Sequence, residues 1–282
     1  MQDKIRNIFM CFPDGKRKSV TLSYDDGVIQ DIRMCDIMTK YGIAGTFNVN
    51  SFNFLCDTQL TAEKSARISL ADAPAIYKEP LFEVATHGFS HPFLTKIPQT
   101  SVVREIMEDR KVIEDGIGII CRGHAYPYGA YDDKVIEALR LCGIVYARTT
   151  HSTRTFGLPK DWLMWHPTCH HNDAALFELL DKFINEQPRL EPWVFYLWGH
   201  TYEFDNGNNW DRIEAFCEKI SGNKEVWFAT NIQIYEYVTA FRSLVYSADG
   251  RRVYNPSSQD VWLSVNSETT YKVPAGRSIY LA

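Results

Sequence analysis

Short runs of β-branched and aromatic residues alternate along the chain with segments in which apolar residues recur at helical spacing. This alternation is typical of βα units that surround a parallel sheet. We predict seven strands, at residues 19–24, 44–49, 82–85, 123–126, 144–147, 194–198 and 226–229. Strands that alternate with helices in this number favour a barrel or a strongly curved parallel sheet over a flat one.

The segments between the strands predict helices, because their apolar side chains share one helix face. The predicted helices lie at residues 29–41, 102–113, 135–139 and 210–220. Asn172 and Asp173 are typical helix-start residues ahead of another apolar face that reaches Ile184. Thr230 and Gln233 have capping-box spacing, which predicts a last helix that ends near residue 244.

The pattern changes after residue 244. Turn residues such as Asn255, Pro256 and Gly276 separate short apolar runs that have no helical period. We expect a barrel domain at residues 1–244 and a small β appendage at residues 245–282. The appendage packs either on the barrel or at a subunit interface of a homo-oligomer.

Composition and charge indicate which kinds of binding partner to expect. The chain has 282 residues, of which 45% are hydrophobic and 23% are charged, so it can bury the core of a large α/β domain. Its formal net charge is -5, and no basic stripe could follow a phosphate backbone, so we expect no nucleic-acid partner. The apolar runs are far shorter than the roughly 20 residues that span a bilayer, so we expect no membrane segment.

The cysteines predict buried, reduced thiols rather than disulfides or a thiolate metal site. They are odd in number and contain no CxxC pair. They are Cys11, Cys35, Cys56, Cys121, Cys142, Cys169 and Cys217. The first 12 residues are too charged for a signal peptide, so we expect a cytoplasmic location.

Polar residues at the carboxyl ends of parallel strands are the places to look for chemistry. Asp25 and Asp26 end the first predicted strand and are followed by Gly27. Successive side chains of a strand point to opposite faces, so both carboxylates reach one site only if the backbone turns there. A solvated Asp-Asp-Gly turn is the alternative reading of this segment.

Two histidines follow the third predicted strand. His87 and His91 are four residues apart, so they can share one face of a helical turn. Two neutral imidazoles and one carboxylate form a facial metal site suited to Zn²⁺ or Fe²⁺. A single histidine would more often be a satisfied core residue, but a pair at a strand end favours a metal.

Two further strand-end segments carry chemistry. The turn from Tyr126 through Pro127 and Tyr128 to Gly129 can hold a backbone N–H in place to stabilise an oxyanion, although alone it is an ordinary turn. His200 ends a late strand beside Trp198, and it could protonate a leaving amine near neutral pH or lie at the surface.

Taken together and in this order, the four segments resemble the polysaccharide deacetylase family, which is the NodB-homology or carbohydrate esterase 4 family. The resemblance covers about residues 18–240 and implies a distorted (β/α)7, TIM-like barrel. It makes Asp25 the general base, and Asp26, His87 and His91 the metal ligands. The metal it implies is Zn²⁺, with Co²⁺, Mn²⁺, Fe²⁺ or Ni²⁺ as alternatives.

The resemblance also implies a reaction. The backbone N–H of Tyr128 would join the metal in binding the oxyanion, and His200 would act as the general acid. The substrate would be an acetylated saccharide that loses its acetyl group to a metal-activated water. The alternatives are an O-acetyl ester, a non-sugar amide such as a cyclic ureide, and an inactive carbohydrate-binding relic.

The sequence departs from the family pattern at two places. Many relatives carry an arginine that contacts the base where this chain has Ala125, and we expect Arg148 to take over that role. Relatives also place an acidic partner for the general acid near the position of Arg148, so we expect Glu203 or Asp205 to replace it. A surface salt bridge is the alternative reading of Arg148.

Aromatic residues near the strand ends favour a sugar over a small ureide. We expect Tyr126, Trp162 and Trp198 to contact the substrate, although large aromatic residues are also common in barrel cores.

Overall fold

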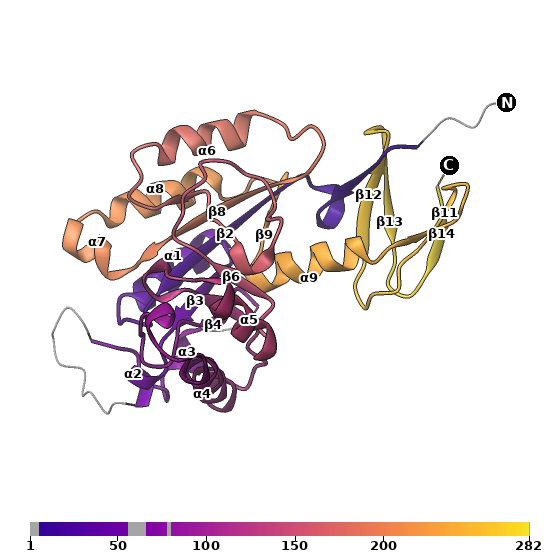
Figure 1. Cartoon of the computed structure of the whole chain (residues 1–282). Coiled ribbons are helices and arrows are strands. Elements are labelled where there is room, and N and C mark those ends of the chain that lie inside the picture. The colour runs from indigo at the N-terminus through magenta and orange to yellow at the C-terminus, as the bar shows by residue number, and fades with distance from the viewer. Residues whose placement is uncertain (1–5, 56–65, 78–79, 282) are drawn as a thin grey trace.

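The computed structural model describes residues 6–55, 66–77 and 80–281. Its centre is a curled parallel sheet with the strand order β6-β5-β4-β3-β2-β8-β7, and β9 pairs with the first half of β2 (Figure 1). The strands are β2 (Lys18–Asp25), β3 (Gly45–Val49), β4 (Phe82–Thr86), β5 (Gly123–Ala125), β6 (Tyr146–Arg148), β7 (Cys169–His170), β8 (Trp193–His200) and β9 (Val226–Phe228). The sheet forms a half-barrel, so the prediction of a barrel-like parallel α/β fold is confirmed.

All seven predicted strands are present, and β7 is an additional strand that the sequence did not reveal. It has only two residues, which is too short to give an apolar pattern. Between β6 and β7, Trp165 forms an isolated parallel bridge with Arg148, which partly closes the gap between the two ends of the sheet. Strand β2 is the hub, because all eight of its residues are buried and it pairs with β3, β8 and β9.

Helices cover the outside of the half-barrel. The longer ones are α1 (Asp31–Tyr41), α4 (Gln99–Ile117), α5 (Asp133–Leu141), α6 (Leu176–Asn185), α8 (Trp210–Ile220) and α9 (Asn231–Arg242). The shorter ones are α2 (Phe52–Leu55), α3 (Ala73–Ile76) and α7 (Tyr202–Gly207), with 3-10 turns at Pro13–Gly15, Leu94–Lys96, Pro127–Gly129 and Trp162–Met164. The capping box of α9 is confirmed, since the Thr230 side chain accepts from the Gln233 N–H and the Gln233 side chain accepts from the Thr230 N–H. Within the described part of the chain, none of the helices is long and apolar enough to span a membrane.

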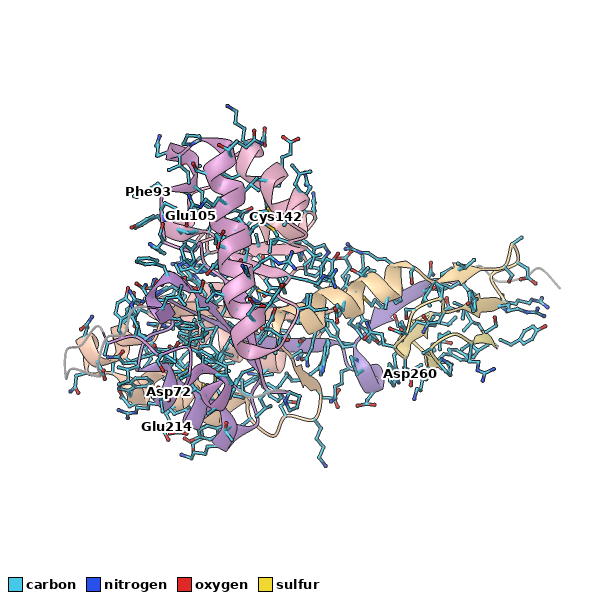
Figure 2. The ribbon with its side chains drawn as sticks, turned by 90° about the horizontal axis from the view of Figure 1, so that it is seen from below. Asp72, Phe93, Glu105, Cys142, Glu214 and Asp260 are labelled. Atoms are coloured by element: carbon cyan, nitrogen blue, oxygen red, sulfur yellow. The ribbon has the colours of Figure 1, made fainter. Side chains whose placement is uncertain are left out.

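The C-terminal residues form two small antiparallel sheets at the far end of α9. One has the order β10 (Val245–Tyr246), β11 (Arg252–Tyr254) and β14 (Ser278–Tyr280). The other joins β1 (Ile8–Cys11) to β12 (Val261–Val265) and β13 (Thr269–Val273), so the N-terminal strand is part of the appendage. Ala240 of α9 and Leu244, which follows the helix, belong to the apolar core of the appendage. Figure 2 shows that the part of the appendage that carries Asp260 projects away from the main body. The domain boundary at residue 244 stays a prediction.

The six cysteines in the described residues are buried and free, as expected, and Cys56 lies outside those residues. They pack as small apolar side chains.

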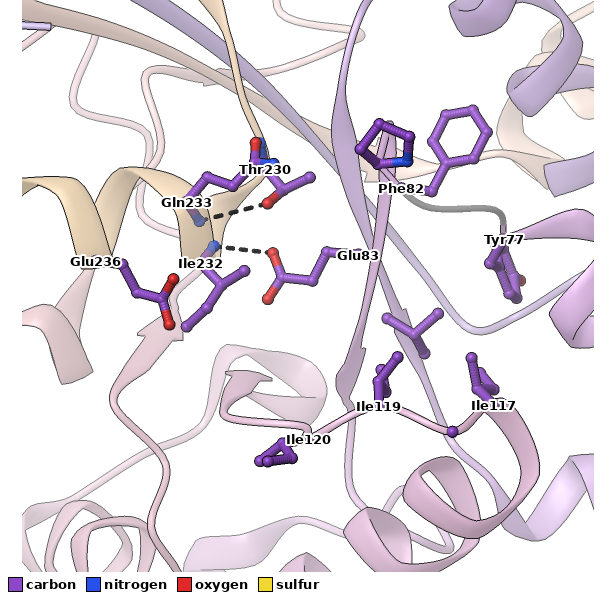
Figure 3. A pocket seen from close by; sticks show the side chains of 13 residues that line it. Tyr77, Phe82, Glu83, Ile117, Ile119, Ile120, Thr230, Ile232, Gln233 and Glu236 are labelled. Atoms are coloured by element: carbon purple, nitrogen blue, oxygen red, sulfur yellow. Dashed lines mark hydrogen bonds between the residues drawn. The ribbon is translucent and has the colours of Figure 1, made fainter. Parts of the chain in front are cut away.

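Glu83 is half-buried near the amino end of β4 and lines a cavity of about 360 Å³ (Figure 3). Its carboxylate accepts hydrogen bonds from the Tyr146 hydroxyl (2.7 Å), the Thr46 hydroxyl (2.8 Å) and the Ile232 N–H (2.9 Å). Glu83 therefore ties the first turn of α9 to three strands. Burial outweighs these hydrogen bonds and raises the pKa of Glu83 from 4.5 to about 7.

This raised pKa predicts a pH-dependent stability. Between pH 4.5 and 7 the unfolded chain loses the Glu83 proton while the folded chain keeps it, so the free energy of unfolding falls as pH rises. We expect Glu83→Gln to remove up to about 1.4 kcal/mol per pH unit from that slope. Urea unfolding between pH 4.5 and 7 measures it, with the exposed Glu218→Gln as the control. An unchanged slope in Glu83→Gln would show that Glu83 is ionised throughout.

Candidate active site

The sequence-predicted polar residues meet at the carboxyl edge of the half-barrel. Asp25 is the last residue of β2, and His87 directly follows β4. Because parallel strands end at the same edge, residues separated by 62 positions along the chain approach one another. The structure brings together Asp25, Asp26, His87, His91 and His200 within a chain of contacts no longer than 3.9 Å.

A backbone turn directs both aspartates into this site. Asp26 has φ 85° and Gly27 has φ 63°, so two consecutive residues adopt the left-handed region. The Asp26 N–H donates to the Asn48 carbonyl (2.9 Å), and the Asn50 side chain donates to Asp26 Oδ1 (3.3 Å). The turn that the sequence required for two inward carboxylates is therefore present.

Two imidazoles and one carboxylate form the candidate metal centre. The Nε2 atoms of His87 and His91 are 3.2 Å apart, and Asp26 Oδ1 lies 3.8 Å from the first and 3.9 Å from the second. His87 Nδ1 donates to the Ala125 carbonyl at 2.8 Å, which leaves the lone pair of Nε2 directed at the centre. Burial, followed by the neighbouring His87, lowers the pKa of His91 to about 4, so this imidazole is neutral at neutral pH.

These residues fit a divalent cation. Nitrogen ligands 2.0–2.1 Å from a tetrahedral Zn²⁺ are about 3.3 Å apart, which is close to the observed 3.2 Å between the imidazole nitrogens. The tautomer of His87 is also the one that a metal ligand needs. The donor set suits Zn²⁺ and other borderline divalent metals.

Asp25 lies beside the candidate metal centre without belonging to it. Its Oδ2 is 3.8 Å from His87 Nε2 and contacts the guanidinium of Arg148, while Oδ1 accepts from the Asn48 side chain at 2.9 Å. Burial would raise the pKa of Asp25, but Arg148 and the nearby imidazoles hold it below its ordinary value. Arg148 is itself fully buried and stacks on Trp198, with 4.4 Å from Cζ to the ring centroid.

His200 approaches Asp25 from the other side. Its Nε2 is 3.9 Å from Asp25 Oδ2, and its Nδ1 is 3.2 Å from Glu203 Oε1. Burial would lower the pKa of His200, but Glu203 and the aspartates raise it above its ordinary value. Asp205, the other candidate partner, instead accepts from Gln30 (2.9 Å) and Trp210 (2.7 Å).

Tyr128 lies at the mouth of the site and is 57% exposed. Its backbone has φ 58°. Its ring lies edge-on to the His91 ring, with 4.5 Å between the ring centroids, and stacks on the Phe93 ring, with 3.8 Å between the centroids. Phe93 is 48% exposed, so the pair presents a flat apolar surface next to the candidate metal centre.

All three predicted substrate-binding rings are buried, which does not support the expectation that they contact the substrate. Tyr126 is 1% exposed, and its hydroxyl donates to the Leu163 carbonyl at 2.8 Å. Trp162 is also buried and packs edge-on against Trp165 and Tyr235. Trp198 is also buried, and its ring packs against the guanidinium of Arg148.

Asp109 on α4 supports the site although none of the strand-end motifs includes it. Its carboxylate accepts from the Ser51 N–H (2.8 Å) and the His87 N–H (2.9 Å), so it fixes the backbone of a candidate metal ligand. A signal was present, because Asp109 lies on the buried face of α4 with Val102, Ile106 and Ile113. A carboxylate on an apolar helix face is buried only with partners.

The fold and the site together define a NodB-type half-barrel with a candidate metal centre at the carboxyl ends of its strands. A family model described as polysaccharide deacetylase matches residues 13–147. Over these residues the chain is similar to the polysaccharide deacetylase family, in agreement with the sequence motifs.

Individual relatives agree with this family. Over 114 residues the chain is 27% identical to chitin deacetylase 1 from Cryptococcus neoformans, a match that covers 39% of this chain and 24% of that protein. The match thus spans about a quarter of the length of that curated relative.

Two solved structures share the fold. A candidate polysaccharide deacetylase from Mycobacterium smegmatis has a TM-score of 0.59 at 16% identity, covering 84% of this chain and 96% of that one. The Xyl-CE4 domain of a multidomain xylanase from the hindgut metagenome of Trinervitermes trinervoides has a TM-score of 0.54 at 15% identity, covering 80% and 92%.

We expect Asp109→Ala to weaken metal binding although Asp109 is not a candidate ligand, because it holds the backbone of His87. The change leaves the N–H groups of Ser51 and His87 without an acceptor, which should cost about 2–5 kcal/mol of stability and lower Zn²⁺ affinity about 10- to 100-fold. Calorimetric Zn²⁺ titration of the folded variants measures the affinity. The exposed Glu108→Ala on the same helix is the control. A folded Asp109→Ala with wild-type affinity would remove Asp109 from the support of the site.

Proposed function

We propose that this protein is a metal-dependent hydrolase that removes the acetyl group of an N-acetylated saccharide. One observation carries the proposal: Oδ2 of the buried Asp25 is 3.8 Å from Nε2 of His87, a member of the candidate metal centre, and 3.9 Å from Nε2 of His200. A hydrolase of amides needs a base, an acid and an electrophile around one carbonyl, and this arrangement supplies all three.

Asp26, His87 and His91 would hold the cation. When bound, a divalent cation of this kind supplies Lewis acidity to a carbonyl oxygen and makes a nearby water more acidic. The remaining roles belong to residues of the chain. They are proton removal, proton donation and stabilisation of charge on the carbonyl oxygen.

Asp25 would remove the proton from the attacking water. A base must be ionised when it acts, and Arg148 keeps the buried carboxylate ionised by lowering its pKa. The Asn48 side chain holds the second oxygen, so the carboxylate has one orientation. Arg148 reaches Asp25 from the end of β6, in the absence of an arginine at position 125.

His200 would then protonate the leaving nitrogen through Nε2. Glu203 accepts from Nδ1 and favours the imidazolium form that this step needs. The backbone N–H of Tyr128 would donate to the developing oxyanion. Acetate and a free amine are the products.

A saccharide is supported by the surface next to the site. The stacked rings of Phe93 and Tyr128 are about half exposed beside His91, and flat aromatic faces suit the apolar face of a sugar ring. The name of the Cryptococcus relative points to an acetylated polymer as well. The buried positions of Tyr126 and Trp162 leave Phe93 and Tyr128 as the aromatic contacts that we propose.

We expect the Zn²⁺-loaded protein to release acetate from N-acetylated oligosaccharides. Asp25→Asn should keep the metal yet lose turnover by about 10²- to 10⁴-fold, because the metal ligands are untouched and the base is gone. His87→Ala should lose both metal and turnover. Acetate release and metal content of the same samples measure the two effects.

The substrate panel distinguishes the alternatives. It includes O-acetylated sugars and a cyclic ureide, supplied with Zn²⁺, Co²⁺ or Mn²⁺. Faster hydrolysis of the ureide would replace the saccharide proposal, and binding of acetylated oligosaccharide without acetate release would indicate a relic. Wild-type turnover in Asp25→Asn would refute the base assignment.

The pH profile should report the acid. Turnover requires Asp25 ionised and His200 protonated, so kcat/KM should fall at low pH as Asp25 gains a proton and at high pH as His200 loses one. Because Glu203 raises the pKa of His200, Glu203→Gln should move the high-pH limb to lower pH. Asp205→Asn, on the same helix but bonded to Gln30, is the matched control. An unmoved limb in Glu203→Gln would argue against His200 as the donor.

A further inference from the structure

A second cluster of imidazoles lies behind His200. Strand β7 ends at His170, which pairs with Trp198 of β8, and the His171 N–H donates to the Trp198 carbonyl at 2.9 Å. This register puts His170 and His171 beside the end of β8, where Glu203 arrives from α7. One carboxylate therefore faces three histidines from two strands.

The two oxygens of Glu203 have different neighbours. Oε1 faces His200 Nδ1 at 3.2 Å, whereas Oε2 is 3.1 Å from His170 Nε2 and 2.9 Å from His171 Nε2. Burial would raise the pKa of Glu203, but the three imidazoles hold it far below its ordinary value. Glu203 is thus an anion with Oε1 bonded to His200 and Oε2 in close contact with two other imidazoles.

The protonation of His170 can be deduced. The Asn172 N–H donates to His170 Nδ1 at 3.1 Å, so Nδ1 offers its lone pair and the hydrogen of the neutral ring is on Nε2, facing Glu203. This is the opposite tautomer to that of His87, whose Nδ1 donates to a carbonyl. His170, His200 and Glu203 are close enough to hold a cation, but in this tautomer Nδ1 of His170 is already bonded and Nε2 carries the hydrogen, so His170 has no free lone pair for a metal.

His171 is held rigidly in place. Its side chain is 1% exposed and stacks between Tyr24 (5.8 Å) and Phe204 (4.1 Å). Burial lowers its pKa to about 4, so it is neutral. The ring lies so close to β8 that a Cβ on Gly199 would be 2.0 Å from His171 Nδ1, which explains the glycine before His200.

We propose that His170 and His171 are positioning residues for the proton donor: they hold Oε2 of Glu203 so that Oε1 stays directed at His200. The proposal rests on the proposed function in so far as His200 is the donor. Glu203 needs such support because it belongs to a six-residue helix and its side chain is 26% exposed. Relatives are expected to place the acidic partner of the general acid at the strand end that Arg148 occupies here. In this chain the acidic partner of His200 is Glu203 of α7.

Other charged groups also act on His200, and a test must separate them. Asp25 and Asp26 face it from β2, Glu203 faces it from α7, and the Tyr202 ring of α7 is 5.1 Å from its ring. Substitution at His170 changes none of these four residues, so a lower pKa of His200 in the variant would report a changed position of Glu203. His170 is also partly exposed, so its replacement should not disturb the core.

The test is an NMR titration of the His200 ring in the Zn²⁺-loaded protein without substrate, its signal assigned by its loss in His200→Gln. His170→Phe keeps the ring that packs edge-on against Trp198 at 4.7 Å but removes the nitrogen that faces Glu203. Glu203 should then turn toward solvent, and the pKa of His200 should fall toward its value in Glu203→Gln. His170→Gln retains an N–H group and should restore most of the wild-type value.

Activity gives a second readout. Near the high-pH limb, His170→Phe should lower kcat about 3- to 10-fold and leave KM within about 2-fold, because the proton donor is affected and not substrate binding. An unchanged or higher pKa of His200 in a folded His170→Phe overturns the proposal. The proposal is also overturned if the wild-type protein binds a second equivalent of Zn²⁺ and His170→Phe does not, because His170 would then be a metal ligand. Since the titration needs no turnover, failure of every substrate would count against the proposed function alone.

Discussion

The site depends on a buried ion pair between Asp25 and Arg148. Asp25 is 2% exposed and Arg148 is fully buried, and a charge removed from water to this extent persists only with a partner. Without the guanidinium, burial would favour the protonated carboxyl, and a protonated Asp25 could not accept a proton from water. The pair also joins the hub strand β2 to β6 at the edge of the sheet, so loss of either partner would leave an uncompensated charge in the core.

The position of that cation determines where the other charges lie. A carboxylate placed near the end of β6 to partner His200 would pair with the guanidinium of Arg148 instead. The acidic partner of His200 is instead Glu203 of α7, whose carboxylate also contacts His170 and His171. Positive and negative groups alternate from Arg148 through Asp25 and His200 to Glu203, and this arrangement lowers the pKa of Asp25 and raises the pKa of His200.

Local patterns in the sequence were sufficient to predict the fold class and the strand-end motifs. The strands alternate with helices in the chain, so the fold class followed from periodicity, and the Asp25–Asp26 and His87–His91 pairs are short-range motifs at strand ends. Arg148 could be anticipated because it also ends a strand. Residue type alone did not separate Tyr126 and Trp162, which are core, from Phe93, which is exposed, since aromatic side chains serve both places. The supports of the site were hidden for a different reason: Asp109 lies 22 residues from His87, and His170 lies 33 residues from Glu203, so only the packed fold brings them together.

Backbone strain is concentrated where the chemistry is proposed. Asp26, His91 and Tyr128 have φ values of 85°, 57° and 58°, and all three lie at the candidate site. Non-glycine residues in this region cost about 1–3 kcal/mol each, and they persist when surrounding contacts determine them. Here the contacts are specific: Asn48 and Asn50 hold the Asp26 turn, Asp109 holds the backbone at His87, and Phe93 stacks on Tyr128. The half-barrel therefore does more than bring strand ends together, because its loops would relax away from these conformations if the polar groups behind them were removed.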